Sequence, residues 1–366
     1  MTQKSKYFII YWLLSGVVLV TAMVVIGGIT RLTGSGLSIV EWKVISGTLP
    51  PLTPEAWNTA FEQYKQFPEY QKLRQGMQLH EFKSIFWWEF VHRLLGRFTG
   101  LVFIIPFLMM LVRWQLQIWL LRRLLIILAL GAAQGLMGWL MVKSGLQNNP
   151  HVSHYRLAMH LSLALFLIST FLWTVFDLVV GKTTKKQVSH PLFPLSVTVL
   201  AVLFVQIVFG AFVAGLKAGF SYNTFPLMNG EFFPAAIAQH LSLSDMFDNG
   251  VSVQFIHRWF AMLVLGLVLY AGYFIRKQNV PASVKLAAAL MGITGLVQVL
   301  SGIATLVLAV PLVLGVLHQV MAVVLFSEAV FLAHRLRYFK HQPLQDKIAV
   351  KKVYAEKATV NQLLQE

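Results

Sequence analysis

The 366-residue sequence contains no cysteine, and only 12% of its residues are charged. The missing thiols exclude disulfide bonds, thiolate metal sites and covalent attachment of a c-type haem. So few charges, with 57% hydrophobic residues and a mean hydropathy of +0.67, exclude an ordinary soluble domain. Acidic residues are scarce, 14 against 30 basic ones, but the basic residues lie between apolar runs, which disfavours a nucleic-acid surface. We therefore predict an integral membrane protein.

Eight apolar segments are each long enough to cross a bilayer core of about 30 Å, which predicts an all-α membrane fold. The first segment is too long for a signal peptide and lacks a small-residue cleavage site, so we expect it to remain as a helix. The predicted spans are Phe8–Gly28, Trp87–Leu111, Leu121–Val142, Leu157–Val180, Leu192–Gly215, Val253–Ile275, Val284–Val310 and Leu312–Leu332.

The distribution of lysine and arginine predicts how these spans are oriented. Eighteen of the 30 basic residues fall on the side that holds the N-terminus, whereas nine of the 14 acidic residues fall on the other side. Because basic loops stay in the cytoplasm or an equivalent compartment, both termini are expected there. The basic segment 341–366 lacks a long apolar run and is expected to be a solvated tail or to touch lipid headgroups.

The second half of the sequence repeats the first. A shift of 183 residues matches the first span and its loop to the fifth, and a shift of 165 matches His92-Arg93 to His257-Arg258. We predict two four-helix units, residues 1–186 and 187–340, that face the same way because each has an even number of spans. The remaining matches are Gly27, Gly36, Ser38, Gly47 and Pro51 with Gly210, Gly219, Ser221, Gly230 and Pro234, and Gln134 and Gly138 with Gln298 and Gly302.

Four histidines lie inside the predicted spans, each near the outer end of an even-numbered segment. Histidine is costly within a membrane and therefore points to function. The residue four positions later is always small, which leaves a shelf on the same helix face. Two imidazoles at one depth in each unit suit axial ligation of a haem iron, and packed or hydrogen-bonded histidines are the alternative. The histidines are His92, His160, His257 and His318, followed by Gly96, Ala164, Ala261 and Ala322.

Other polar residues near these segments are weaker candidates. A copper or zinc site normally needs closely spaced ligands, and His151 and His154 lack further partners, so we expect both on the surface. Four basic residues are placed either to pair with haem propionates or to snorkel to headgroups: Arg31, Arg93, Lys217 and Arg258. Asp177 and Glu328, near the inner helix ends, are interpreted as snorkelling charges.

One residue breaks the symmetry between the units. Glu89 precedes His92 by three positions, whereas Gln254 holds the same place before His257. Glu89 is either a helix-start carboxylate that suits the dipole or an acid that accepts protons from a substrate under oxidation. We favour the second interpretation, in which the first unit performs chemistry and the second holds an electron-carrying haem.

Taken together, these residues resemble the haem A synthase family, in particular the longer type shared by mitochondria and many Gram-negative bacteria. The resemblance runs from residue 7 to about 336. Some members carry a cysteine pair in the first outer loop, which this sequence lacks, so any role of that pair is absent here. The resembling segments are 27–33 (GGITRLT), 35–38 (SGLS), 81–86 (EFKSIF), 89–93 (EFVHR), 134–135 (QG), 142–146 (VKSGL) and 223–228 (NTFPLM).

The resemblance implies a reaction and a set of roles. It implies two pseudo-symmetric four-helix bundles that oxidise a methyl group of haem O to a formyl group, giving haem A for the terminal oxidase. It also implies that His92 and His160 flank the substrate haem, that Glu89 assists catalysis, and that His257 and His318 ligate a haem b cofactor. Apart from the resemblance, their positions lead us to expect Arg31 and Arg93 at the substrate haem and Arg258 at the cofactor.

Several expectations about surroundings accompany this interpretation. The protein would lie in a bacterial inner membrane with its haem sites near the outer face, bind lipid, and take haem O as substrate. Haem O synthase, an electron acceptor and a second copy of the chain are expected partners, and nucleic acid is not. A di-haem b electron carrier linked to quinol, or a haem transporter, is the alternative function, and Glu89 favours the enzyme.

Overall fold

The computed structural model describes residues 2–42, 46–113, 116–147, 150–180, 189–239 and 242–338. Within these ranges eight helices are long and apolar enough to span a membrane, which confirms the predicted all-α fold. The sole β-type pairing in the described chain is an isolated bridge between Met228 and Glu231. The eight helices are α1 (Gln3–Leu32), α4 (Leu79–Arg113), α5 (Ile118–Gly145), α6 (His154–Val180), α7 (Phe193–Gly215), α10 (Gly250–Lys277), α11 (Ala282–Val307) and α12 (Leu312–Arg337).

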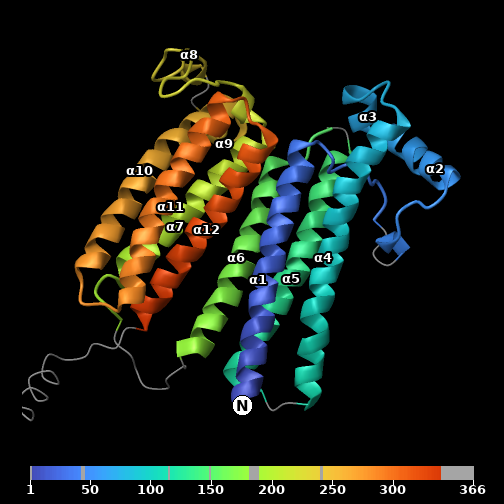
Figure 1. The fold of residues 1–366 in the computed structure, drawn as a ribbon. Coiled ribbons are helices and arrows are strands. Elements are labelled where there is room, and N and C mark those ends of the chain that lie inside the picture. Colours follow the sequence, from blue (N-terminus) through green and yellow to red (C-terminus); the bar gives the residue numbers. More distant parts are fainter. Residues whose placement is uncertain are drawn as a thin grey trace, which may run out of the picture.

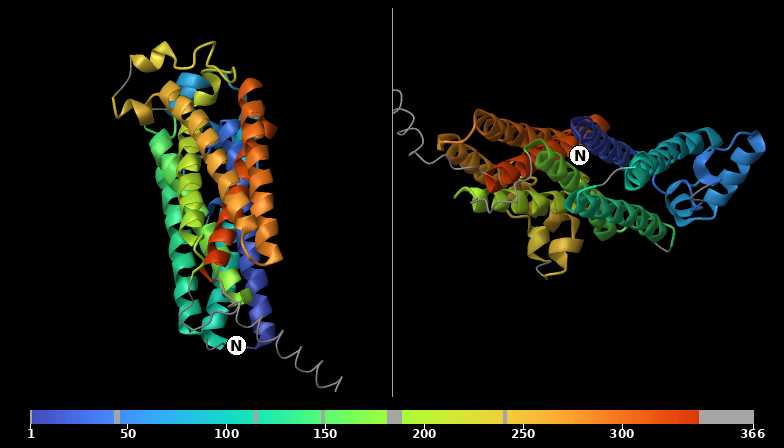
Figure 2. Two further views of the ribbon diagram at one scale, coloured as in Figure 1. Left: turned by 90° about the vertical axis from the view of Figure 1, so that its left-hand side faces the viewer. Right: turned by 90° about the horizontal axis from the view of Figure 1, so that it is seen from below.

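The spanning helices form two groups that follow the order of the chain (Figure 1). Helices α1, α4, α5 and α6 form one group, and α7, α10, α11 and α12 form the other, as the view from below in Figure 2 also shows. The groups meet where α6 packs on α7 and where α12 packs on α1 and α6. This arrangement is consistent with the repeat of four-helix units predicted from the sequence.

The short helices gather at the end of the molecule opposite the N-terminus (Figure 1). Those of the first outer loop pack on the outer part of α4, where Trp57, Phe61 and Tyr64 are buried against Phe82 and Phe86. This apolar contact explains why the insertion in the first outer loop packs against helix α4 of the same unit. The short elements are η1 (Ser46–Thr48), α2 (Pro54–Lys65), α3 (Pro68–Leu73), η2 (Ala218–Phe220), α8 (Ala235–Ala238) and α9 (Asp245–Asp248).

Several helices extend beyond the spans predicted from hydropathy, and α4 and α12 show why. Helix α4 begins at Leu79, about two turns before the predicted start at Trp87, because the first outer loop covers this part of it. Helix α12 continues to Arg337 instead of ending at Leu332, and its last turn is buried at His334 and Leu336. The predicted tail at 341–366 lies outside the described residues.

Candidate functional site

Each of the four predicted histidines lies edge-on against a glycine of the neighbouring helix. A Cβ atom added to Gly27 of α1 or to Gly138 of α5 would lie 3.2 Å from Cε1 of His92 or His160, respectively. In the second unit the same distance is 3.1 Å from Gly210 of α7 to His257 and 2.7 Å from Gly302 of α11 to His318. An alanine would crowd the ring in every case, so the glycines fix how close each imidazole lies to the adjacent helix.

The histidines come together in two pairs, one in each unit. His92 and His160 lie within electrostatic range of each other, and so do His257 and His318. Glutamine side chains accompany three of the four rings. The Nε2 atoms of Gln134 and Gln298 lie 3.3 and 3.4 Å from Nε2 of His160 and His318, and Nε2 of Gln206 lies 3.0 Å from Nδ1 of His257.

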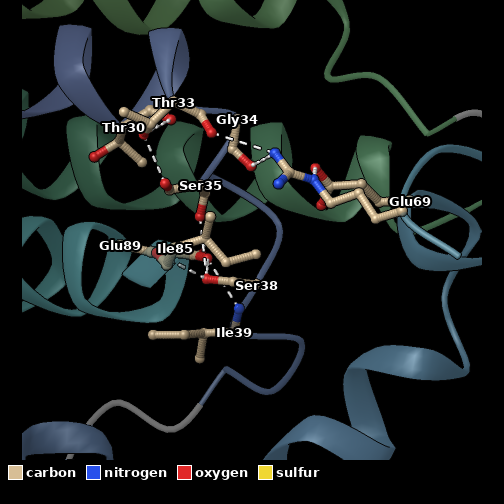
Figure 3. Close-up of polar contacts among 10 residues, drawn as sticks. Thr30, Thr33, Gly34, Ser35, Ser38, Ile39, Glu69, Ile85 and Glu89 are labelled. Carbon is tan, nitrogen blue, oxygen red and sulfur yellow. Dashed lines mark hydrogen bonds and ion pairs between the residues drawn. The ribbon is translucent and has the colours of Figure 1, made fainter. Parts of the chain in front are cut away.

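Glu89 is buried in the first unit, with 2% of its surface exposed, and every carboxylate oxygen has a donor. Figure 3 shows Ser38 and Ile39 against this side chain. Ser38 Oγ and the Ile39 amide donate to Oε2 at 2.7 and 2.9 Å, and Arg93 donates to Oε1 at 2.6 Å. Since α4 begins at Leu79, Glu89 lies in the interior of the helix, and the helix-start interpretation is wrong. Three donors around one acceptor-only group fit an ionised carboxylate.

Arg93 and Arg258 make equivalent contacts in the two units. Arg93 donates to the carbonyls of Ile39 and Glu41, and Arg258 donates to those of Tyr222 and Thr224, which lie 183 residues further along the chain. Both arginines therefore hold the loop after the first helix of their unit. Arg258 keeps Nε and Nη1 buried without a hydrogen-bond partner, whereas Arg93 also contacts Glu89. Pairing with propionates stays a prediction for both.

The other basic candidate of the first unit, Arg31, lies at the seam between units. Its Nη1 donates to the carbonyl of Ala214 at the end of α7. Lys217 is exposed and adopts a left-handed backbone conformation just after that helix. A role of Arg31 toward a haem therefore stays a prediction.

Three residues predicted to lie at the surface or interface are placed differently. His154 Nε2 pairs with Asp248 Oδ1 at 3.1 Å, and its side chain is 14% exposed, so that prediction is wrong, whereas His151 is exposed. Asp177 is buried and contacts His334 Nε2 at 3.0 Å across α6 and α12 instead of snorkelling. Glu328 is half-buried and accepts a hydrogen bond from Thr294. Sequence reasoning missed these interhelical partners because they come from distant segments.

The first outer loop has its own charged contact beside the Glu89 segment. Arg74 Nη2 donates to the carbonyls of Thr33 and Gly34, and its Nε lies 3.5 Å from Oε1 of Glu69. Burial raises the pKa of Glu69 to about 7, and the nearby positive charge of Arg74 offsets part of that rise. The contact ties α3 to the end of α1.

The residues of both units fit bis-imidazole ligation of a haem. Each imidazole packs against a glycine of the neighbouring helix, imidazole is a common axial ligand of haem iron, and Arg258 has two unpartnered buried nitrogens. No cluster of three or more His, Asp or Glu side chains able to hold a metal ion occurs in the described part of the chain. A haem, which needs one histidine on each face, suits paired histidines better than a bare ion does.

Comparison with known proteins places the chain. The model of the cytochrome oxidase assembly protein family matches residues 10–330. The chain belongs to this family. Among curated relatives, the haem A synthase of Parvibaculum lavamentivorans is 43% identical over 92% of this chain and 96% of its own. The haem A synthase of Nitrosospira multiformis is 46% identical over 89% of this chain and 92% of its own. That of Flavobacterium psychrophilum is 44% identical over 91% of this chain and 99% of its own. Family membership implies that haem takes part in the function.

Sequence reasoning found the histidines but missed most of what surrounds them. In the sequence the four glycines mark only the repeat, and their contact with the histidine rings comes from helix packing. Ser38 likewise marks only the repeat in the sequence, and in the structure it donates to Glu89. The repeat of the two halves contains a signal for these contacts, because the matched glycines lie on the spanning helix that precedes the helix of each histidine.

Proposed function

We propose that the chain is a haem A synthase, which oxidises a methyl group of haem O to a formyl group and so supplies haem A for cytochrome oxidase assembly. The observation that carries this proposal is that both units contain a pair of histidines packed against glycines, whereas only the first unit has a buried carboxylate, Glu89, one helical turn from a histidine. Gln254 replaces Glu89 in the second unit and donates to the Tyr222 carbonyl. An electron carrier would have no use for that difference.

The two units take different roles in this proposal. His92 and His160 hold the substrate haem in the first unit, and His257 and His318 hold a haem b in the second, with Arg258 toward its propionates. The haem b supplies electron transfer when it is bound. Converting R–CH3 and one water to R–CHO releases four protons and four electrons, so water supplies the oxygen, the electrons pass to an acceptor outside the chain and the protons need a base.

Glu89 is positioned to be that base. An ionised carboxylate held by Ser38, Ile39 and Arg93 has a fixed orientation, and it can take a proton on Oε1 or Oε2 when a donor moves away. Arg93 also holds the loop of residues 39–41 against α4 through the carbonyls of Ile39 and Glu41. Arg258 makes the same loop contact in the second unit, but there Gln254 takes the place of the acid.

Extraction of pigment from purified protein tests the function directly. Protein made together with haem O synthase is expected to yield haem B, haem O and haem A, separated by chromatography. His257→Ala or His318→Ala is expected to remove the low-spin haem b, because each leaves a bis-imidazole site with one ligand. Haem B alone in the extract would favour the electron carrier, and an unchanged low-spin spectrum in both variants would reject the cofactor assignment.

The location in the membrane follows from the same proposal. The spanning helices make the chain a multi-pass membrane protein. We place it in a bacterial inner membrane with both termini cytoplasmic and both haem sites near the outer face, because all four histidines lie toward the outer ends of α4, α6, α10 and α12.

A further inference from the structure

The two units differ at the imidazole nitrogen Nδ1. In the second unit Ser301 Oγ lies 3.1 Å from Nδ1 of His318, and the Gln206 amide lies 3.0 Å from Nδ1 of His257. In the first unit, Nδ1 of His92 and of His160 is buried without a hydrogen-bond partner. Both histidines of one unit are therefore supported at this atom, and both histidines of the other are not.

The sequence repeat shows which residues of the first unit stand at the positions of Gln206 and Ser301. The shift of 183 residues that matches Gly27 to Gly210 also places Met23 at the position of Gln206. The shift of 164 that matches Gly138 to Gly302 places Met137 at the position of Ser301. A thioether is at best a weak acceptor, so each methionine removes one partner.

Support at Nδ1 matters when Nε2 binds iron. The proton then lies on Nδ1, and an acceptor for it fixes the ring and raises the basicity of the ligand. Ser301 Oγ is such an acceptor, because it gives its own hydrogen to the carbonyl of Gln298 at 2.9 Å. Gln206 holds His257 differently, because its Nε2 lies at Nδ1 and also donates to the His257 backbone carbonyl at 2.9 Å.

The packing of the helices differs in the same direction. Helices α4 and α5 contact each other over much less of their length than the matching pair α10 and α11. Only 11% and 6% of the apolar stretches of α4 and α5 are buried, against 33% for both α10 and α11. The first unit is thus less closed on the side that carries His92.

We propose that Met23 and Met137 make the first unit an exchangeable haem site, whereas Gln206 and Ser301 make the second unit a retentive one. This rests on the proposed function, in which the first unit must accept haem O and release haem A at every turnover. The retained haem b in the second unit has no such need. The four residues position their histidines and do not touch the reacting atoms.

Two reciprocal substitutions test the proposal through haem release and redox potential. Ser301→Ala in otherwise intact protein is expected to speed transfer of haem b to apomyoglobin by roughly 10- to 100-fold and to raise its midpoint potential, since a less basic ligand stabilises ferric iron less. Ser301→Thr keeps the hydroxyl and is expected to restore both values. In a His257→Ala background, where only first-unit haem remains, Met137→Ser is expected to slow release of haem O.

The outcomes separate the two proposals. If Ser301→Ala leaves release and potential unchanged, or Met137→Ser leaves release unchanged, the inference about Nδ1 support is wrong. If His257→Ala keeps its low-spin haem b, the assignment of haems to units fails first. A potential that shifts equally in Ser301→Ala and Ser301→Thr would indicate a packing effect and would also overturn the inference.

Discussion

At the scale of single residues, Glu89 distinguishes one unit from the other. Glu89→Gln reproduces the second unit, where Gln254 still donates to the Tyr222 carbonyl, so the loop contact should survive. Haem binding is expected to persist while haem O or a hydroxylated intermediate accumulates, because a general base contributes about 10²- to 10⁴-fold. Chromatography of extracted haems from a strain supplied with haem O measures this.

A matched control for Glu89→Gln is Ser38→Ala, which removes one donor but keeps the acid. It should retain most of the haem A yield. Haem A formation near the wild-type rate in Glu89→Gln would show that the carboxylate only holds the loop, and the catalytic assignment of the first unit would lose its main support.

The glycines beside the histidines give a second prediction at this scale. In Gly302→Ala the new Cβ would lie 2.7 Å from Cε1 of His318, so the ring must move and the low-spin haem b should be lost. Gly266→Ala in the same unit is the control, because its Cβ would meet nothing within 4 Å. Absorption spectra and haem content measure both variants, and equal haem content would contradict a role of the glycine in setting the ring.

At the scale of elements, helix α3 depends on pH through Glu69. Burial raises the pKa of Glu69 to about 7, above its ordinary 4.5, so the folded loop binds this proton more tightly than the unfolded loop does. The contribution of Glu69 to stability is therefore fully present below pH 4.5 and is lost as pH rises through 7. Limited proteolysis of the first outer loop at about pH 5.5 and about pH 8, on either side of the raised pKa, should show faster cleavage at the higher pH.

The control for this pH effect is Glu69→Gln, which cannot ionise. Its cleavage rate should change much less between the two pH values, after correction for protease activity on an unfolded substrate. A wild-type loop that is cleaved more slowly at the higher pH would mean that the ion pair with Arg74 outweighs the desolvation of Glu69, and the predicted pH dependence would be wrong in sign.

At the scale of the whole molecule, the orientation in the membrane is the main open prediction. A reporter fused after Glu366 is expected in the cytoplasm, and one inserted near Gln71 is expected on the other side. The eight spans require the two reporters to lie on opposite sides. A cytoplasmic reporter near Gln71 would invert the topology and place the histidines near the inner face.

The sequence by itself determined the membrane fold, the eight spans and the four histidines, because hydropathy and the cost of polar groups in lipid act locally along the chain. It also exposed the contrast of Glu89 with Gln254 through the repeat. Only the tertiary structure decided which groups meet. The contacts of Glu89 with Ser38, of His318 with Ser301 and of Asp177 with His334 join separate segments, and close packing between helices, which no local pattern encodes, brings them together.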